Sequence, residues 1–369
     1  MKKIAVIFGG QSTEHDVSVV SGLYISKCID KQKYDVTNIY IDQKGIWYIY
    51  DSSNYNIELG EQLDSLKPIT CLTDYLKTFD CIFPALHGLY GEDGTIQGLF
   101  ELLKIPYVGC KVLGSSLAMD KVYAKIIFNQ AGLKQVNYEY IRKHNDKYIY
   151  IDKNFNEAEY SLTEISKLIE KNIKYPMFVK PSNSGSSIGI TKASNIKELQ
   201  TSIEEAAKYD KKILIEEGIE MRELECAVLG NEDVLVSCVG EIMSADDFYD
   251  YDSKYKNASS YTVNHADLDP KIEDKIKKQA IKAFKSVDGK GLSRVDFFLD
   301  KENNIYINEI NTMPGFTGIS MYPKLMEESG IDGKSLTTKL IELAFEEWVF
   351  SLFLFIEINI DITNYFLYS

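Results

Sequence analysis

Residues 304–315 read NIYINEINTMPG, a stretch that carries polar side chains where a buried strand would have apolar ones. Its three isoleucines are typical of a strand. Glu309 and Asn311 lie two positions apart, so a strand places both side chains on the same face. A carboxylate and an amide oxygen would then point at one place.

A second polar strand precedes this stretch. Residues 293–300 read SRVDFFLD, which predicts a strand carrying Asp296 among apolar residues. If the two strands form a hairpin across DKENN, three oxygen ligands converge with Glu309 and Asn311. Hard oxygen ligands of this kind suit Mg²⁺, which completes its shell with waters and substrate phosphates. The alternative is an ordinary hairpin with one exposed, polar face.

The length, net charge and cysteine content of the chain argue against several classes of protein. The chain has 369 residues, enough for two or three domains with sizeable cores. Its net charge of −14, with no block of Lys and Arg, argues against a nucleic-acid or anionic-membrane partner. Its six cysteines are scattered without a C-x-x-C pair, which favours a reducing compartment. The start MKKIAVIFGG is interrupted by glycines and predicts a first strand rather than a signal peptide. We therefore expect a soluble, cytoplasmic protein.

The last segment, 347–369, differs from the rest of the chain. It is far more apolar and aromatic, but Glu357 and Asp361 interrupt it. It is too short and too charged for a comfortable membrane span. It could pack as an extra strand or helix, or be an adventitious tail.

The pattern of elements predicts an α/β first domain followed by an α+β region. Residues 1–121 alternate strands and helices, which indicates a doubly wound parallel sheet. A helix is expected over 116–132, then a Tyr- and Asn-rich connection. We divide the remainder into a central subdomain (122–213) and a C-terminal subdomain (214–346). In the latter, the polar, aromatic segment 244–262 has no periodicity and predicts a long functional loop.

A loop of small residues follows another predicted strand. In VKPSNSGSSIGI (179–190), a strand ends after Lys180, and Ser182 to Ser187 form a loop before strand resumes. Such loops offer backbone N–H groups and hydroxyls to phosphate oxygens. The sequence is not a P-loop, and the glycines after the first strand do not match the dinucleotide fingerprint. Taken alone, this segment is more typical of a hairpin turn than of a phosphate-binding loop.

The order of these features carries more weight than any one of them. Two spaced lysines, a glycine-serine loop, acids at the end of ILIEE (213–217) and the polar hairpin together suit a nucleoside triphosphate held between sheets. This order resembles that of the ATP-grasp ligases. More closely, the chain resembles the D-alanine–D-alanine ligase family from Met1 to about Phe345. The matching stretches include IAVIFGGQSTEHDVSVVSG, FPALHGLYGEDGTIQGLFELLKIPYVG, SLAMDK, FVKPSNSGSSIGI, FYDYDSKY, SRVDFF and INEINTMPGFTGISMYP.

The resemblance implies an ATP-grasp fold with ATP held between the central and C-terminal sheets. Lys121 and Lys180 would bind the ATP phosphates, and the loop with Ser187 would close over them. Glu216 would accept from the adenine amino group, although the neighbouring Glu217 leaves the register open, and Glu223 would bind the ribose. The full implied ATP set is Lys121, Lys180, Ser187, Glu216, Glu217, Ile219, Glu223 and Lys254. Asp296, Glu309 and Asn311 would hold two Mg²⁺ ions, or Mn²⁺ in their place.

The resemblance also implies the substrates and the chemistry. Glu14, in a network with Ser186 and Tyr255, would bind the ammonium group of a first D-alanine beside His87. Its carboxylate would attack the γ-phosphorus of ATP, and a second D-alanine would attack the resulting acyl phosphate. Arg294 and the backbone N–H of Gly315 would face the oxyanion, and Ser320 would bind the second carboxylate. The product, D-alanyl-D-alanine, would serve peptidoglycan synthesis, and the family resemblance suggests a homodimer.

Other interpretations remain open on the sequence. Relatives of these ligases use D-serine or D-lactate as the acceptor; Tyr255 matches the dipeptide-forming pattern and supports D-alanine. The pair Gly318-Ile319 stands where bulkier or polar pairs are usual, which affects the second subsite. A nucleotide-binding module without turnover is a third reading. Taken singly, Glu14 could complement a helix dipole and Lys121 could be a solvated helix charge.

Overall fold

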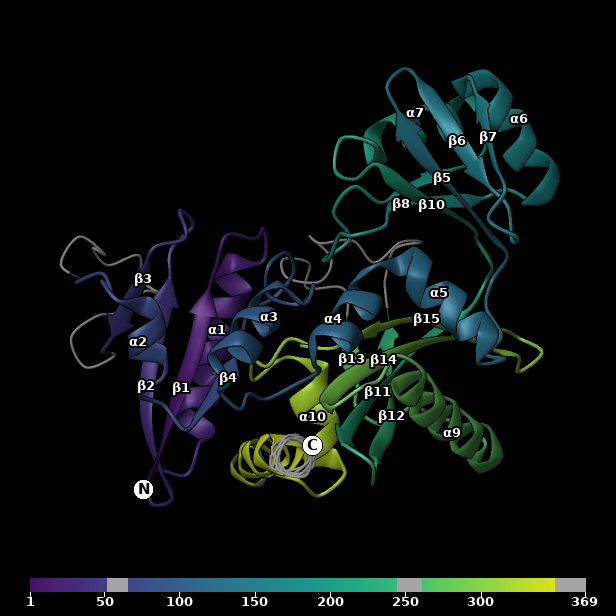
Figure 1. Cartoon of the computed structure of the whole chain (residues 1–369). Coiled ribbons are helices and arrows are strands. Elements are labelled where there is room, and N and C mark those ends of the chain that lie inside the picture. Colours follow the sequence, from purple (N-terminus) through teal and green to yellow (C-terminus); the bar gives the residue numbers. More distant parts are fainter. Residues whose placement is uncertain (52–65, 244–260, 349–369) are drawn as a thin grey trace, which may run out of the picture.

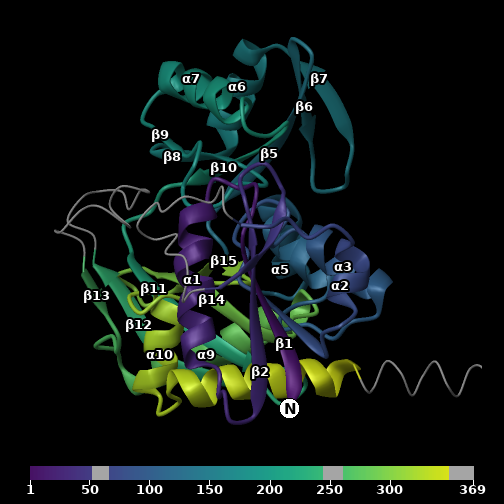
Figure 2. The ribbon, with the colours of Figure 1, turned by 90° about the vertical axis from the view of Figure 1, so that its left-hand side faces the viewer.

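The computed structural model describes residues 1–51, 66–243 and 261–348, and these form three β-sheets that follow one another along the chain (Figure 1). The predicted loop 244–262 lies almost wholly outside the described residues, as does the tail from 349 onward. The middle sheet stands above the other two, and the helix over 333–348 runs along the base (Figure 2).

The first sheet has the strand order β3-β2-β1-β4. Its central strand β1 runs parallel to both neighbours, and the edge strand β3 is antiparallel to β2. Residues 4–8 of β1 are fully buried, because a parallel strand is covered on both faces. The predicted parallel, doubly wound domain is confirmed, with an antiparallel edge strand added. Its elements are β1 (Lys2–Gly9), α1 (His15–Cys28), β2 (Tyr34–Ile41), β3 (Trp47–Tyr50), α2 (Leu72–Leu76), β4 (Cys81–Pro84) and α3 (Thr95–Leu103).

The single helix predicted over 116–132 is wrong, because the structure has two: α4 (Val112–Met119) and α5 (Lys121–Gln130). The break is at Asp120, whose backbone is extended. Its carboxylate accepts hydrogen bonds from the N–H groups of Val122 and Tyr123, and so caps α5. An aspartate that can cap a new helix competes with continuation of the old one.

The middle sheet is fully antiparallel, with the order β7-β6-β5-β10-β8-β9. Two helices, α6 and α7, cover one face, and their isoleucines and leucines form a core with the apolar residues of the strands. The predicted Tyr- and Asn-rich connection instead contains three strands and a helix. The elements are β5 (Tyr138–His144), β6 (Lys147–Ile151), β7 (Glu157–Tyr160), α6 (Leu162–Asn172), β8 (Met177–Pro181), β9 (Thr191–Ala193), α7 (Ile196–Ala206) and β10 (Lys212–Glu217).

The third sheet is also antiparallel, with the order β13-β12-β11-β14-β15. The change of sheet comes after Glu217, because all of β10 belongs to the middle sheet; the boundary expected at 213/214 falls inside that strand. One face packs on α9 and α5, and the other packs toward α10 and the first domain. The elements are β11 (Arg222–Gly230), β12 (Leu235–Met243), β13 (Tyr261–Val263), α9 (Pro270–Ser286), β14 (Gly291–Leu299), β15 (Ile305–Asn311) and α10 (Met321–Glu328).

The helix over 333–348 joins the third sheet to the first domain. Leu336, Leu340 and Ile341 are fully buried in the same core as Ile4 of β1. The ammonium group of Lys2 lies 4.2 Å from the ring centroid of Phe345. This helix therefore packs the third sheet and the first domain into one core.

Candidate active site

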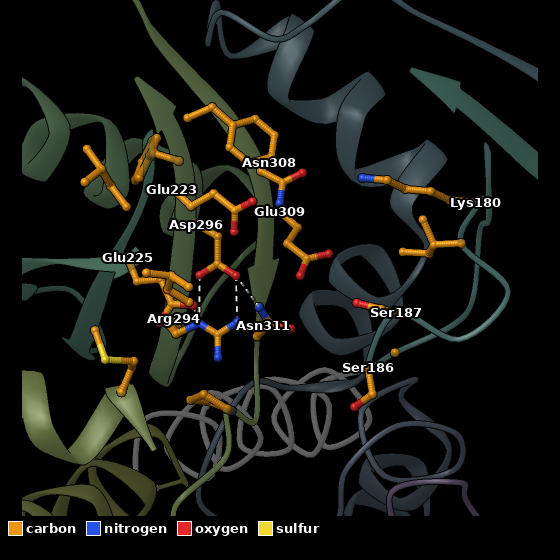
Figure 3. Close-up of a pocket in the computed structure, with 18 of the residues that line it drawn as sticks. Lys180, Ser186, Ser187, Glu223, Glu225, Arg294, Asp296, Asn308, Glu309 and Asn311 are labelled. Carbon is orange, nitrogen blue, oxygen red and sulfur yellow. Dashed lines mark hydrogen bonds and ion pairs between the residues drawn. The ribbon is translucent and has the colours of Figure 1, made fainter. Parts of the chain in front are cut away.

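A cavity of about 1290 Å³ lies where the three sheets meet (Figure 3). It is larger than most small-molecule sites, which hold roughly 300–1,000 Å³, and has room for more than one ligand. Sixteen of the eighteen residues predicted for the site line it. These are Glu14, His87, Lys121, Lys180, Ser186, Ser187, Glu216, Glu217, Ile219, Glu223, Arg294, Asp296, Glu309, Asn311, Gly315 and Ser320. The other two, Lys254 and Tyr255, lie outside the described residues.

The β14–β15 hairpin places four polar side chains on the cavity face. Asp296 pairs directly with Glu309, and Arg294 with Asn311 (Figure 3). The Arg294 guanidinium donates to both Asp296 oxygens, at 2.7 and 2.6 Å, and Asn311 Nδ2 donates to Asp296 Oδ2 at 3.2 Å. The hairpin predicted from the sequence is confirmed.

A β-bulge at Asn308 aims this cluster. Phe297 pairs with Ile307 and Asp296 with Glu309, so Asn308 is the extra residue. Without it, Glu309 would share the face of Ile307, which is buried against α9. A bulge re-aims the side chains that follow it, and here it turns Glu309 into the cavity. The irregular spacing of the isoleucines in 304–315 is the sequence trace of this bulge.

Arg294 lies between two carboxylates. Its Nε is 3.3 Å from Glu225 Oε1, in addition to its contacts with Asp296. Burial would lower the pKa of Arg294, but the charges of Asp296 and Glu225 raise it well above its ordinary value. The guanidinium is therefore permanently charged and held in one orientation.

Two lysines predicted to bind phosphates are paired with carboxylates. Lys121 Nζ is 2.9 Å from Glu309 Oε2, and Lys180 Nζ is 2.5 Å from Glu216 Oε2. Lys125 approaches the other Glu216 oxygen, also at 2.5 Å. Burial would raise the pKa of Glu216, but Lys125 and Lys180 lower it to about 2.

The period of β10 gives Glu216 and Glu217 different surroundings. Ile213 and Ile215 pack against the helices of the middle sheet, so Glu216 lies on the opposite, cavity-facing side. Its side chain is buried. That of Glu217 is half-buried and accepts a hydrogen bond from Asn137 Nδ2 at 2.5 Å.

The loop from Ser182 to Ser187, called the serine loop below, brings the first domain and the middle sheet together. Ser186 and Ser187 have φ values of 48° and 61°, an uncommon backbone conformation for residues other than glycine. A Cβ added to Gly185 would lie 2.0 Å from Glu14 Oε1. The Glu14 carboxylate therefore lies directly on the backbone of this loop, which only a glycine at 185 allows.

His87 is buried and held on both nitrogens. Its Nδ1 is 2.9 Å from the Met313 carbonyl oxygen, and its Nε2 is 2.9 Å from Ser21 Oγ. Burial would lower the pKa of His87, but Glu92, 3.8 Å from Nδ1, and then Glu14 raise it. Burial raises the pKa of Glu92 in turn. Through its contact with the Met313 carbonyl oxygen, His87 links the first domain to the turn that follows β15.

The turn between β15 and α10 also lines the cavity. The Ser320 hydroxyl accepts from the Thr317 N–H at 3.0 Å and lies 2.7 Å from Thr317 Oγ1. A Cβ on Gly315 would come within 3.0 Å of Ser320 Oγ. The Gly315 backbone and the Ser320 hydroxyl therefore face each other at the start of α10.

The comparisons with known proteins agree with one another. A family model described as D-ala D-ala ligase N-terminus matches residues 3–110, and one described as D-ala D-ala ligase C-terminus matches residues 127–342. The chain belongs to the D-alanine–D-alanine ligase family. The D-alanine–D-alanine ligase of Clostridium acetobutylicum is 48% identical over 93% of this chain and 98% of its own. That of Acetivibrio thermocellus is 47% identical over 94% and 96%.

Solved structures of this family share the fold. A D-alanine–D-alanine ligase from Coxiella burnetii matches with a TM-score of 0.82 and 32% identity, over 98% of this chain and 99% of its own. The VanG D-Ala:D-Ser ligase from Enterococcus faecalis matches with a TM-score of 0.81 and 37% identity, over 93% and 99%. The predicted ATP-grasp fold and ligase family are confirmed. Among the described residues, no helix is both long and apolar enough to cross a membrane.

The oxygen atoms of the β14–β15 hairpin are of the kind that Mg²⁺ prefers as ligands. The hairpin offers two carboxylates and one amide oxygen on adjacent strands. No three His, Cys, Asp or Glu side chains that could hold a metal ion converge within residues 1–51, 66–243 and 261–348. Mg²⁺ is usually bound by one or two carboxylates together with waters and phosphate oxygens.

Three charged residues that contact predicted site residues were not identified from the sequence: Lys125, Glu92 and Glu225. Lys125 lies one helical turn after Lys121, a spacing that could have signalled it. Glu92 follows His87 in HGLYGED, and Glu225 lies two positions after Glu223 on β11, so both share a strand or a turn with a predicted residue.

Proposed function

We propose that this protein joins two D-alanine molecules to form D-alanyl-D-alanine for peptidoglycan precursors, with conversion of ATP to ADP and phosphate. One observation supports it above the others: the Arg294–Asp296–Glu309–Asn311 cluster lines the same cavity as Glu14. A nucleotide, a first amino acid and a second one would each have charged partners there, in a chain of this family.

We assign the ATP phosphates to Lys121, Lys180 and the serine loop. Both lysines already hold carboxylates, which phosphate oxygens would replace. Adenine would lie at the end of β10, near Ile219. Because the Glu216 carboxylate already has two lysine partners, we assign the acceptor for the adenine amino group to a main-chain oxygen there. Glu217 would border this site and Glu223 would bind the ribose hydroxyls.

Asp296, Glu309 and Asn311 would hold Mg²⁺, with Mn²⁺ as a possible substitute. When bound, the metal would neutralise charge on the transferring phosphoryl group. The protein residues prepare that exchange, because Lys121 and Arg294 hold the two carboxylates in place beforehand.

Glu14 would bind the ammonium group of the first D-alanine, next to Ser186 and with His87 alongside. The substrate carboxylate would then attack the γ-phosphorus, giving an acyl phosphate and ADP. This activation is needed because a carboxylate is a poor acyl donor. Lys254 and Tyr255, which lie outside the described residues, would complete the phosphate contacts and the Glu14 network.

Arg294 and the Gly315 N–H would stabilise the oxyanion that forms when the second amine attacks the acyl carbon. Each donor of this kind lowers the barrier by about 3–4 kcal/mol. Phosphate then leaves and the amine loses a proton, so the products are the dipeptide and phosphate. Ser320 would bind the carboxylate of the second D-alanine.

D-serine is the alternative second substrate, and the likeness to a D-Ala:D-Ser ligase favours testing it. Ile319, next to Ser320 and 72% exposed, lines the cavity with an apolar side chain. An apolar neighbour offers the hydroxyl of D-serine no hydrogen-bond partner, and Tyr255 matches the dipeptide-forming pattern of the family. We therefore place D-alanine first.

The test is phosphate release from ATP and Mg²⁺ with D-alanine alone, then with D-alanine plus D-serine or D-lactate, with products identified by mass. L-alanine is the matched control for stereochemistry. Dipeptide from D-alanine alone at neutral pH supports the proposal. A mixed product made in preference to the dipeptide would change the acceptor. ATP binding without turnover in any mixture would instead indicate a nucleotide-binding module.

A homodimer and a cytoplasmic location complete the proposal. Light scattering on a gel-filtration column measures the first directly, and a mass of one chain would contradict it. Fractionation of cells that express the protein tests the second.

A further inference from the structure

Lys125 is a buried lysine that the proposed reaction does not use. It lies on α5 with its side chain 2% exposed. Its ammonium group is 2.5 Å from Glu216 Oε1, 3.5 Å from Gln135 Oε1 and 5.2 Å from the ring centroid of Tyr138. A lysine is almost never this buried unless it is paired, so Glu216 accounts for its position.

Glu216 has a second lysine on its other oxygen. Lys180 Nζ is 2.5 Å from Glu216 Oε2, and one buried carboxylate thus lies between two ammonium groups. The two lysines differ in access. Lys180 is 14% exposed and lines the cavity, whereas Lys125 is 2% exposed and does not line it. Lys180 is therefore the partner that a ligand can reach.

The two lysines of α5 connect two sheets. Lys121 and Lys125 are four positions apart and share a face of the helix. Lys121 contacts Glu309 on β15 of the third sheet, and Lys125 contacts Glu216 on β10 of the middle sheet. A buried carboxylate that loses all its cations is strongly disfavoured. Glu216 would otherwise compete with phosphate for Lys180.

We propose that Lys125 is a positioning residue: it holds the Glu216 carboxylate and its charge, so that Lys180 can leave Glu216 for an ATP phosphate. The inference rests on the proposed function in one respect, the assignment of Lys180 to the nucleotide. Without Lys125, Lys180 is the one ion-pair partner left to Glu216 among the described residues, and Glu216 retains it. Nucleotide binding then has to break the last ion pair of a buried carboxylate.

The experiment is a double-mutant cycle on nucleotide affinity. Calorimetry measures the Kd of a non-hydrolysable ATP analogue with Mg²⁺ for the wild type, Lys125→Met, Glu216→Gln and the double variant. Lys278→Met is the matched control, because Lys278 lies on α9 and is 73% exposed in its pair with Asp274. We expect Lys125→Met to weaken the Kd at least about tenfold, in the range for losing one partner of a buried charge pair. In the Glu216→Gln background the same change should have almost no effect, because no carboxylate is left to retain Lys180.

Each outcome has one meaning. Equal loss in both backgrounds would overturn the inference, since Lys125 would then act on the nucleotide directly or through the fold. No loss in either would overturn it as well. If Lys125→Met does not fold, the double variant still serves, because the only charge that it leaves without this carboxylate is that of the cavity-facing Lys180; its Kd should still equal that of Glu216→Gln. Absence of binding to the wild type would instead refute the nucleotide site itself, and so the proposed function.

Discussion

Replacing Gly185 by alanine should disable the site while leaving the fold intact. The new Cβ would lie 2.0 Å from Glu14 Oε1, whereas ordinary contacts begin at 3.4 Å. The carboxylate must therefore retreat by about 1.4 Å. The backbone of Gly185 is not in the left-handed region, so alanine brings no φ strain of its own.

The expected loss follows from that displacement. A misplacement of about 1 Å in a positioning group can reduce the rate about 100-fold, so we expect kcat/KM for D-alanine to fall by roughly that factor. The atom that moves is the end of a flexible side chain. The free energy of unfolding should therefore change by less than about 1 kcal/mol, and Tm by less than about 4 °C.

Phosphate release measures the rate and calorimetry measures Tm. The control is Gly98→Ala, because Gly98 lies inside α3 and a Cβ there meets nothing within 4 Å. It should keep its kinetics and gain up to about 1 kcal/mol from better helix propensity. If Gly185→Ala retains kcat/KM within about threefold of the wild type, Glu14 does not bind the substrate from this position and the reasoning is refuted.

Three further changes test other parts of the site. Glu309→Gln should keep the fold but lose at least about 100-fold in Mg²⁺-dependent phosphate release; near-normal turnover would exclude the metal assignment. Asp120→Ala removes the cap of α5 and the partner of Lys212, and should cost about 2–4 kcal/mol in urea unfolding, whereas Asp120→Asn keeps a capping oxygen and should cost less. The pKa of Glu216 is lowered to about 2 from 4.5, so its stabilisation is complete above pH 4.5 and is lost as pH falls toward 2. Between pH 6 and pH 3 the wild type should lose about 2 kcal/mol more than Glu216→Gln does; parallel urea profiles would contradict the lowered pKa.

The β14–β15 hairpin could be predicted because its evidence is local. Its strands carry polar residues among apolar ones, and its ligands are within sixteen positions of one another. Asn308 shows the limit of that evidence. The change in isoleucine spacing is visible in the sequence, but only the cross-strand register identifies it as a bulge.

Strands β5 to β7 of the middle sheet escaped prediction because they resemble a loop in composition. Tyr148 is buried on β6, yet it is flanked by charged and half-exposed residues typical of a strand near the edge of a sheet. The break at Asp120 escaped for a different reason. An aspartate inside an apolar helical pattern is compatible with either one helix or two, and the decision depends on Lys212, Ser182 and Asn183, which are more than sixty residues away. Packing partners that distant leave no local signal.

The charges of the site explain how so many ionised groups remain buried without substrates. Lys121 holds Glu309, Lys180 holds Glu216, and Arg294 holds Asp296, so each of these six charged groups has an opposite charge within the protein. Substrate binding as proposed would exchange these partners: phosphate oxygens would replace carboxylates on the lysines, and Mg²⁺ would replace cations on the carboxylates. Such an exchange keeps the charge balance of the cavity nearly constant, and the strongest penalty, that of an unpaired buried ion, does not arise at any stage. A group that loses its partner and gains none from the ligands needs a second partner in the protein, as Arg294 has in Glu225 and Glu216 has in Lys125.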